Sequence, residues 1–197
     1  MSSKIFGLSM LGVLIAMSFS GVQSAYAEGT VQCSIDASPC PKGNVVNHIH
    51  LTTLSGAKAK LLTSIINVEC DILFLGDLIG MVGSWMVYLG HYTLTNCGSC
   101  TVEEWSGEST IEILKTSHET ALAVGEGETH VNCSGLNCYY NAEGLEGTAK
   151  GPLLSSETNG SVSIQEQTVK KVKGLFCPST NKLDIVITPL SATYITE

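Results

Sequence analysis

Cys97 and Cys100 have the spacing of a redox-active cysteine pair, whose chemistry is thiol–disulfide exchange. A working pair needs an exposed thiolate at the N-terminus of a helix. The residues that follow do not predict an amphipathic helix, and Glu103 and Glu104 disfavour a thiolate nearby. The sequence therefore favours structural bridges at these cysteines, with a thiol–disulfide oxidoreductase at Cys97 and Cys100 as an alternative.

The chain has eight cysteines, and this even number is typical of a disulfide framework. We expect a local bridge between Cys33 and Cys40, which flank a short loop. The remaining six cysteines allow about fifteen pairings, so spacing alone does not fix them. The preferred pairs are Cys70 with Cys97, Cys100 with Cys133, and Cys138 with Cys177.

Two groups of residues have the side chains of a metal site. Cys97, Cys100, Cys133 and Cys138 could form a four-cysteine zinc site, but disulfides are favoured in an exported protein. His48 and His50 would share one face of a strand, where no third ligand can be placed beside them. We therefore expect no metal site and no cofactor.

Carboxylates are the other candidates for chemistry, because two carboxyl groups suffice for glycoside hydrolysis. A secreted hydrolase that uses carboxylates on loops is thus an alternative function. The candidate glutamates are Glu103, Glu104, Glu108, Glu126, Glu128, Glu143 and Glu146. No catalytic motif is complete, so we assign no catalytic residue. Trp105 beside Glu103 and Glu104 is the candidate ligand-binding site, since an exposed tryptophan can stack on a glycan or contact a peptide.

The N-terminus resembles a secretion signal. Lys4 gives a positive start, residues 5–19 are apolar, and Ala25 and Ala27 form a small-x-small cleavage site. Cleavage after Ala27 would make residues 1–27 a signal peptide and would place the protein outside the cell, in the periplasm or in the cell envelope. Such compartments are oxidising, in agreement with paired cysteines.

The charge of the chain is low and acidic. Charged residues make up 14% of the sequence, the formal net charge is −8, and all ten basic residues other than histidine are lysines. This balance argues against nucleic acid as a partner and against anionic membrane surfaces.

Short runs rich in valine, isoleucine, threonine and tyrosine alternate with turn residues, as in Asn47–Leu51 and Ser161–Gln165. This spacing predicts an all-β fold, a disulfide-stapled antiparallel β-sandwich or barrel. The apolar stretch Ile72–Tyr92 contains Asp77 and several glycines, so two successive strands are favoured over a membrane span, and we expect no transmembrane anchor in the mature chain. We expect an N-terminal segment at 28–56 and a β-sandwich core at 57–197.

Four segments resemble a loose group of uncharacterised exported bacterial proteins, common in actinobacteria, that have an all-β core. The segments are Ile66–Cys70, Thr93–Cys97, Cys133–Tyr139 and Gly174–Pro178. The resemblance spans most of residues 33–196 and implies a fold class without an activity. The chain departs from the group in being more apolar across Leu78–Leu89.

The expected function is that of an exported, non-enzymatic module of the cell envelope or extracellular space, with a binding or structural role. A glycan or a protein is the expected type of ligand, and the hydrolase and oxidoreductase described above are the alternatives.

Overall fold

The computed structural model describes residues 29–62, 65, 67–105, 107–117, 120–150, 153–155, 157–158 and 160–196. The expected signal peptide, 1–27, lies outside these residues. The described chain is nearly all β, with antiparallel strands and one short 3-10 turn, η1 (Lys42–Asn44), which confirms the predicted class.

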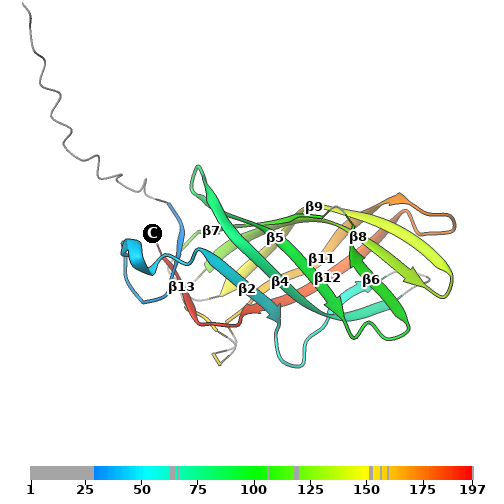
Figure 1. Cartoon of the computed structure of the whole chain (residues 1–197), viewed down its shortest axis with the longest axis horizontal. Helices are drawn as coiled ribbons and strands as arrows, with labels where there is room; N and C mark the ends of the chain where they lie inside the picture. Colours follow the sequence, from blue (N-terminus) through cyan, green and yellow to red (C-terminus); the bar gives the residue numbers. More distant parts are fainter. Residues whose placement is uncertain are drawn as a thin grey trace, which may run out of the picture.

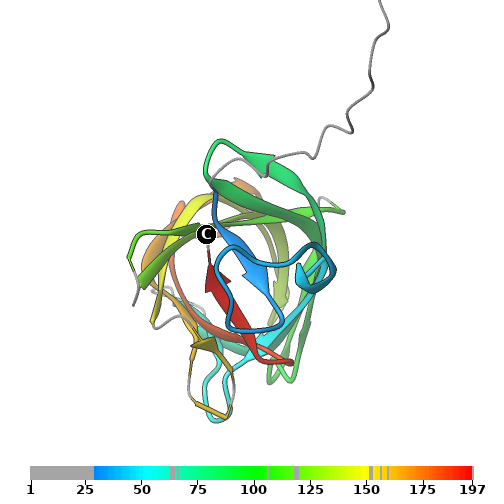
Figure 2. The same ribbon diagram turned by 90° about the vertical axis from the view of Figure 1, so that its left-hand side faces the viewer.

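Ten of the strands close into a barrel (Figures 1 and 2). They are β2 (His48–Thr53), β3 (Ala59–Leu62), β4 (Asn67–Val82), β5 (Trp85–Thr95), β6 (Cys100–Glu104), β7 (Ser109–Lys115), β8 (Thr120–Cys133), β9 (Leu136–Lys150), β11 (Val162–Lys173) and β12 (Thr180–Pro189). The barrel closes because β12 pairs with β11 on one side and with β2 and β3 on the other. Of the two architectures expected, sandwich or barrel, the chain forms the barrel.

The ten strands occupy eight positions around the wall. β2 and β3 both lie between β4 and β12, and β6 and β7 both pair with β8, so each of these pairs is one strand interrupted by a few extra residues. Neighbours in the wall follow one another in the chain, which gives an up-and-down order. Because β2 is part of the wall, the expected boundary at residue 56 falls inside the barrel.

A second, three-stranded sheet lies across one end of the barrel (Figure 2). It consists of β1 (Val31–Cys33), β10 (Leu153–Leu154) and β13 (Thr193–Thr196). β13 is the central strand of this sheet, between β1 and β10. Val31, Leu154 and Ile195 join the hydrophobic core, so the small sheet plugs this end.

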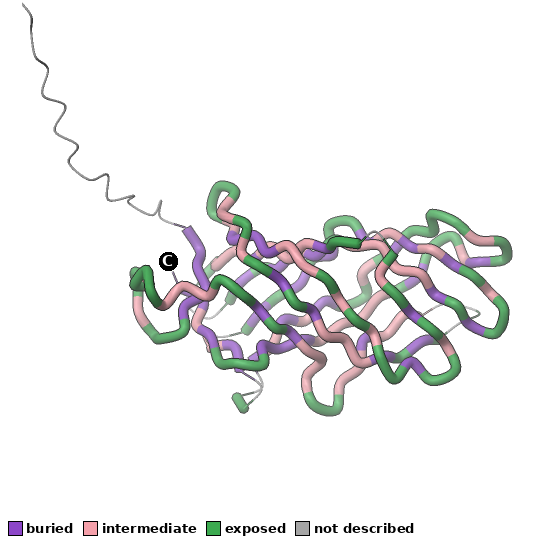
Figure 3. The backbone as a smooth tube through the Cα atoms, in the orientation of Figure 1, coloured by how far each residue is buried: buried purple, intermediate pink, exposed green. Residues whose placement is uncertain are grey.

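The predicted alternation along the strands is confirmed (Figure 3). Ile49 and Leu51 are buried, whereas His48 and His50 are exposed, because successive side chains of a strand point to opposite faces. The inward residues form two clusters, one next to the plug and one toward the opposite end of the barrel. Residues 72–92 form the β4–β5 hairpin, and no helix in the described part of the chain could cross a membrane.

All four preferred disulfides are present: Cys33–Cys40, Cys70–Cys97, Cys100–Cys133 and Cys138–Cys177. Cys33–Cys40 reinforces the plug. The other three bridges join neighbouring parts of the wall near the hairpin turns at the opposite end, which we call the disulfide rim. Cys97 and Cys100 are bonded to different partners, so the pair expected for an oxidoreductase does not form. Four disulfides fit a non-cytoplasmic protein.

Candidate functional site

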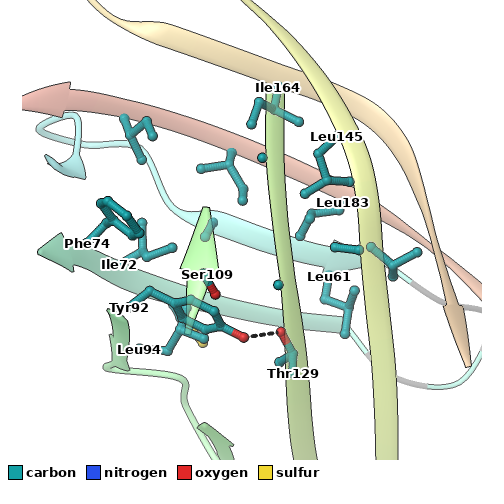
Figure 4. A pocket seen from close by; sticks show the side chains of 18 of the residues that line it. Leu61, Ile72, Phe74, Tyr92, Leu94, Ser109, Thr129, Leu145, Ile164 and Leu183 are labelled. Carbon is teal, nitrogen blue, oxygen red and sulfur yellow. Dashed lines mark hydrogen bonds between the residues drawn. The ribbon is translucent and has the colours of Figure 1, made fainter. Parts of the chain in front are cut away.

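A cavity of about 130 Å³ lies inside the barrel, in the half toward the disulfide rim (Figure 4). Side chains from β3, β4, β5, β9, β11 and β12 converge on it. Most of them are apolar, and the largest contributors are Leu61, Ile72, Phe74, Leu94, Leu145, Ile164 and Leu183. A concave apolar space of this kind is the usual form of a small-molecule site.

The cavity exists because β8 lacks side chains on its inner face at this level. Gly125 and Gly127 both line the cavity, and the ladder between β8 and β9 shifts register between them. A Cβ atom on Gly125 would meet only the Cβ of Leu145, at 3.9 Å. Toward the plug, by contrast, Met86, Tyr88 and Ile113 fill the barrel almost completely.

Three hydroxyl groups form one polar part of the cavity wall. The hydroxyl of Tyr92 lies 2.6 Å from the carbonyl oxygen of Glu128 and 2.6 Å from Oγ1 of Thr129. Ser109 Oγ donates a 2.6 Å hydrogen bond to Oε1 of Glu104. Burial raises the pKa of Tyr92 above its ordinary value, and the charges of Glu104 and Glu128 raise this pKa further, against a lowering by Thr129. Tyr92 is therefore a neutral phenol at ordinary pH.

Glu104 lies in a seam of the wall between β5 and β6. No backbone ladder joins His91–Thr95 of β5 to Cys100–Glu104 of β6, two segments that the structure describes in full. The Glu104 side chain is only 9% exposed and lies between Ser109 and His91, whose Nδ1 is 3.0 Å from Oε2. Glu104 thus links a residue of the cavity wall to a residue on the outer surface.

The structure separates the three residues of the expected ligand-binding site. Glu103 points outward, with 65% of its side chain exposed and an oxygen 3.8 Å from Nδ1 of His130. Trp105 is also exposed and packs edge-on against Tyr139, with ring centroids 4.7 Å apart. Glu104 faces the interior instead, because alternate residues of β6 point to opposite sides of the wall.

The aromatic group on the outer wall is wider than Trp105 alone. The ring of Tyr139 stacks on His130 at 4.4 Å, and the ammonium group of Lys173 lies 5.3 Å from the centre of the same ring. Glu103, Trp105, His130 and Tyr139 therefore form a continuous outer surface, to which sequence reasoning assigned only Glu103 and Trp105.

The other candidates for chemistry are dispersed. His48 and His50 are exposed on the outer face of β2, where His48 pairs with Asp77. The described residues contain no cluster of three or more His, Cys, Asp or Glu that could hold a metal ion. Among the candidate glutamates, Glu108, Glu126, Glu143 and Glu146 are exposed. No pair of these carboxylates is brought face to face in the cavity.

Sequence reasoning missed Tyr92, Ser109 and Thr129. Alternation along residues 91–95 places Tyr92 and Leu94 on one face of a strand, but it does not say which face looks into a cavity. The glycines at 125 and 127 were a usable signal, because adjacent gaps on one strand face leave space opposite them.

No protein-family profile, curated protein or solved structure matches this chain. The site must therefore be interpreted from its own geometry.

Proposed function

We propose that this protein is an exported, non-enzymatic binding module that holds a small apolar ligand inside its barrel. The observation that carries the proposal is the cavity of about 130 Å³ among the apolar side chains of the rim half. Barrels of eight strands have an interior wide enough for packed side chains or for one small ligand.

The size of the cavity suits a single aromatic ring or a similar small group. An engineered apolar cavity of about 150 Å³ in another protein stays dry and binds benzene. Binding in such a space replaces contacts with water by contacts with apolar walls, which is favourable for an apolar ligand.

The arrangement of hydroxyl groups supports binding over hydrolysis. Ser109 donates its hydrogen bond to the carboxylate of Glu104, and the imidazole of His91 contacts the other carboxylate oxygen. A serine nucleophile needs a base in direct contact with its hydroxyl group and free to accept the proton. Here the contacting group is a carboxylate already held between two partners, so we favour binding over the hydrolase alternative.

Export is the part of the proposal that rests on the N-terminal sequence. The signal-like residues 1–27 support secretion to the cell envelope or the extracellular space, and four disulfides are compatible with either. The resemblance to exported proteins of actinobacteria supports a bacterial source.

A titration with benzene tests the cavity, followed by chemical shifts of the methyl groups of Leu94 and Leu145. We expect saturable shifts in the oxidised wild-type protein. Gly125→Val should weaken benzene binding at least tenfold, because the added methyl groups project into the cavity.

Leu122→Phe is the matched control, since Leu122 lies on the same strand and is 40% exposed on the outer face. This variant should bind benzene like the wild type. Absence of saturable shifts in the wild type, or equal binding by the Gly125→Val variant, would refute a ligand site in the cavity.

A further inference from the structure

The hydroxyl groups of the cavity wall have a definite donor and acceptor pattern. A carbonyl oxygen only accepts, so the single hydroxyl hydrogen of Tyr92 is given to the carbonyl oxygen of Glu128. The 2.6 Å contact between Tyr92 and Thr129 then requires Thr129 to donate its own hydrogen to the Tyr92 oxygen. Ser109 gives its hydrogen to Glu104.

All three hydroxyl hydrogens are therefore in use, and the capacity that remains on these oxygens is lone pairs. A hydroxyl oxygen has two acceptor positions, so Thr129 and Ser109 can each still accept a hydrogen bond. Gly127 keeps the space between them open: a Cβ there would come within 2.6 Å of Ser109 Oγ and 3.3 Å of the Tyr92 ring.

Fixed charges around this wall are negative. Glu104 lies directly behind Ser109, whereas Glu126, which also borders the cavity, is exposed to solvent. Lys60 is the basic residue among the described lining residues, and its ammonium group is 3.2 Å from Glu69, which is half exposed. At Ser109 and Thr129, a carboxylate ligand would meet the negative charge of Glu104 and hydroxyl groups whose hydrogens are already in use, whereas a hydroxyl or amino group would meet acceptors.

We propose that the ligand is a small apolar molecule that carries one hydrogen-bonding group, a hydroxyl or an amino group, whose hydrogen Thr129 accepts; the second hydrogen of an amino group would go to Ser109. This inference rests on the proposed function of the cavity. It makes the site unsuited to fatty acids and other carboxylates, and it assigns selectivity to two hydroxyl groups of the wall.

Four ligands with a single aromatic ring test the inference: phenol, aniline, benzene and benzoate, measured by the same methyl shifts. Phenol and aniline should bind three- to tenfold more tightly than benzene, which is the gain of one net hydrogen bond. Benzoate should not bind measurably. Thr129→Val should reduce the affinity for phenol and aniline at least threefold relative to the affinity of the same variant for benzene.

Two further variants separate the outcomes. Thr129→Ser keeps the hydroxyl group and should retain the preference for phenol, and Thr93→Val, on the exposed face of β5, should change nothing. Benzene binding with no preference for phenol, or with benzoate bound best, would contradict the preference for a ligand with a hydrogen-bond donor. It would not contradict ligand binding in the cavity. Binding of none of the four ligands would overturn both.

A second inference concerns the outer end of the barrel. The turn between β11 and β12 lies at the end of the barrel that is far from the plug (Figure 1). Its tip consists of Leu175 and Phe176, which are 82% and 85% exposed. Phe176 has a φ of 61°, a left-handed conformation that costs roughly 1–2 kcal/mol for such a residue. Two large apolar side chains are thus held out in solvent by a strained turn.

The charge around this tip is opposite to that of the whole chain. Between Glu166 and Asp184 the sequence has four lysines, Lys170, Lys171, Lys173 and Lys182, and no acidic residue. The turns at 96–99 and 134–135, at the same end of the barrel, also contain no acidic residue. Asp71 pairs with Thr95 beside the turn at 96–99, and it is bound by Lys58 and by Asn96.

From the exposed pair and the lysines we infer that the β11–β12 tip docks on an anionic lipid bilayer. Leu175 and Phe176 would enter the interface, and the lysines would lie above acidic headgroups. The net charge of −8 does not oppose this, because charges farther away than the Debye length of about 8 Å are screened at physiological salt.

Sedimentation with lipid vesicles tests the docking surface. We expect binding to vesicles of equal parts phosphatidylglycerol and phosphatidylcholine, and none to pure phosphatidylcholine. Replacing both Leu175 and Phe176 with serine should lower the partition coefficient at least tenfold. Replacing Lys170 with glutamine should lower it about fivefold, the contribution of one lysine at such a surface.

Leu122→Ser, which removes an exposed leucine far from the tip in the sequence, is the control and should bind like the wild type. Equal binding to both vesicle types, or no binding to either, would overturn the inference. So would a concentration-dependent dimer that the double serine variant abolishes, since a second copy of the chain would then cover the tip.

Discussion

Gln32 is a fully buried residue of the plug, and neither its amide nitrogen nor its amide oxygen has a hydrogen-bond partner in the described part of the protein. Burial of an unpaired amide costs about 1–3 kcal/mol. Gln32→Met keeps the length of the side chain and removes both polar atoms. We expect it to raise the free energy of unfolding by about 1 kcal/mol, measured by urea denaturation. A loss of stability in this variant would mean that the amide makes a stabilising contact.

Because the phenols of Tyr88 and Tyr92 are buried, we expect the folded protein to lose stability at high pH. Burial raises the pKa of both phenols above their ordinary value of 10.0 in the folded protein. The folded state therefore holds these protons at a pH where the unfolded chain releases them. The stabilisation is complete below about pH 10 and is lost as the pH rises above it, by about 1.4 kcal/mol per pH unit for each group.

Urea denaturation across this alkaline range checks the pH dependence. Tyr88→Phe should make the decline less steep, because one of the two titrating groups is gone. The same variant should cost about 1 kcal/mol at neutral pH, since Tyr88 donates a 2.8 Å hydrogen bond to the carbonyl oxygen of Val46. An unchanged slope in the variant would exclude Tyr88 as a source of the decline.

At the scale of elements, one disulfide stabilises the plug and the other three stabilise the wall. Cys33–Cys40 closes a loop of seven-residue separation in the plug, and Cys138–Cys177 joins β9 to the β11–β12 turn across a separation of 39. The chain-entropy model relates the stabilisation to loop length and gives about 2.5 kcal/mol for the short loop and about 4 kcal/mol for the long one.

Replacing each pair by serines should therefore destabilise the protein unequally. We expect the double serine variant at Cys138 and Cys177 to lose about 1.5 kcal/mol more than the one at Cys33 and Cys40, as measured by urea denaturation under non-reducing conditions. The decisive result is which of the two variants has the lower free energy of unfolding. If the plug variant were the less stable one, the small sheet would contribute more to the barrel than its loop length indicates.

The alternation along β6 decides which side chains of the expected site can act together. Glu103 and Trp105 reach the aromatic outer surface, and Glu104 reaches the cavity wall. A ligand on the outer surface would thus contact Tyr139 and His130, whereas a ligand in the cavity would contact Ser109 in front of Glu104. The two sites are physically separate and can be tested by separate variants.

At the scale of the whole molecule, closure at β12 removes the free edges that an open sheet would have at this strand. β12 finds partners on both sides, so no strand at this seam offers unpaired backbone groups to another chain. The plug closes one end, and the three bridges of the rim hold the other. A stable wall of this kind allows a cavity to persist where side chains are missing.

The chain should lose its signal peptide during export. We expect secretion to remove residues 1–27 and to leave Glu28 as the N-terminal residue, because the Ala25-x-Ala27 site follows the apolar run. N-terminal sequencing of protein recovered from the medium or envelope is the measurement. Recovery of a chain that still begins at Met1 would contradict a cleaved signal.

Local features of the sequence were sufficient for the class of fold. Alternation of two residues fixed the buried face of runs such as Ile49 with Leu51, because it follows from the pleat of a single strand. The turn residues separated these runs, and the eight cysteines indicated full pairing. The preferred pairs were confirmed, although spacing alone left other pairings open.

The closure of the barrel, the plug and the cavity were decided only by tertiary structure. They depend on which distant strands pair and in which register, as for β12 with β2, and no local pattern specifies that. The alternation along β6 put Glu103 and Glu104 on opposite faces, but only the closed wall placed Glu104 beside Ser109 and left the inner side of Gly125 empty. A cavity is the space that side chains from several strands fail to fill, so it is a property of the assembled barrel and of no single segment.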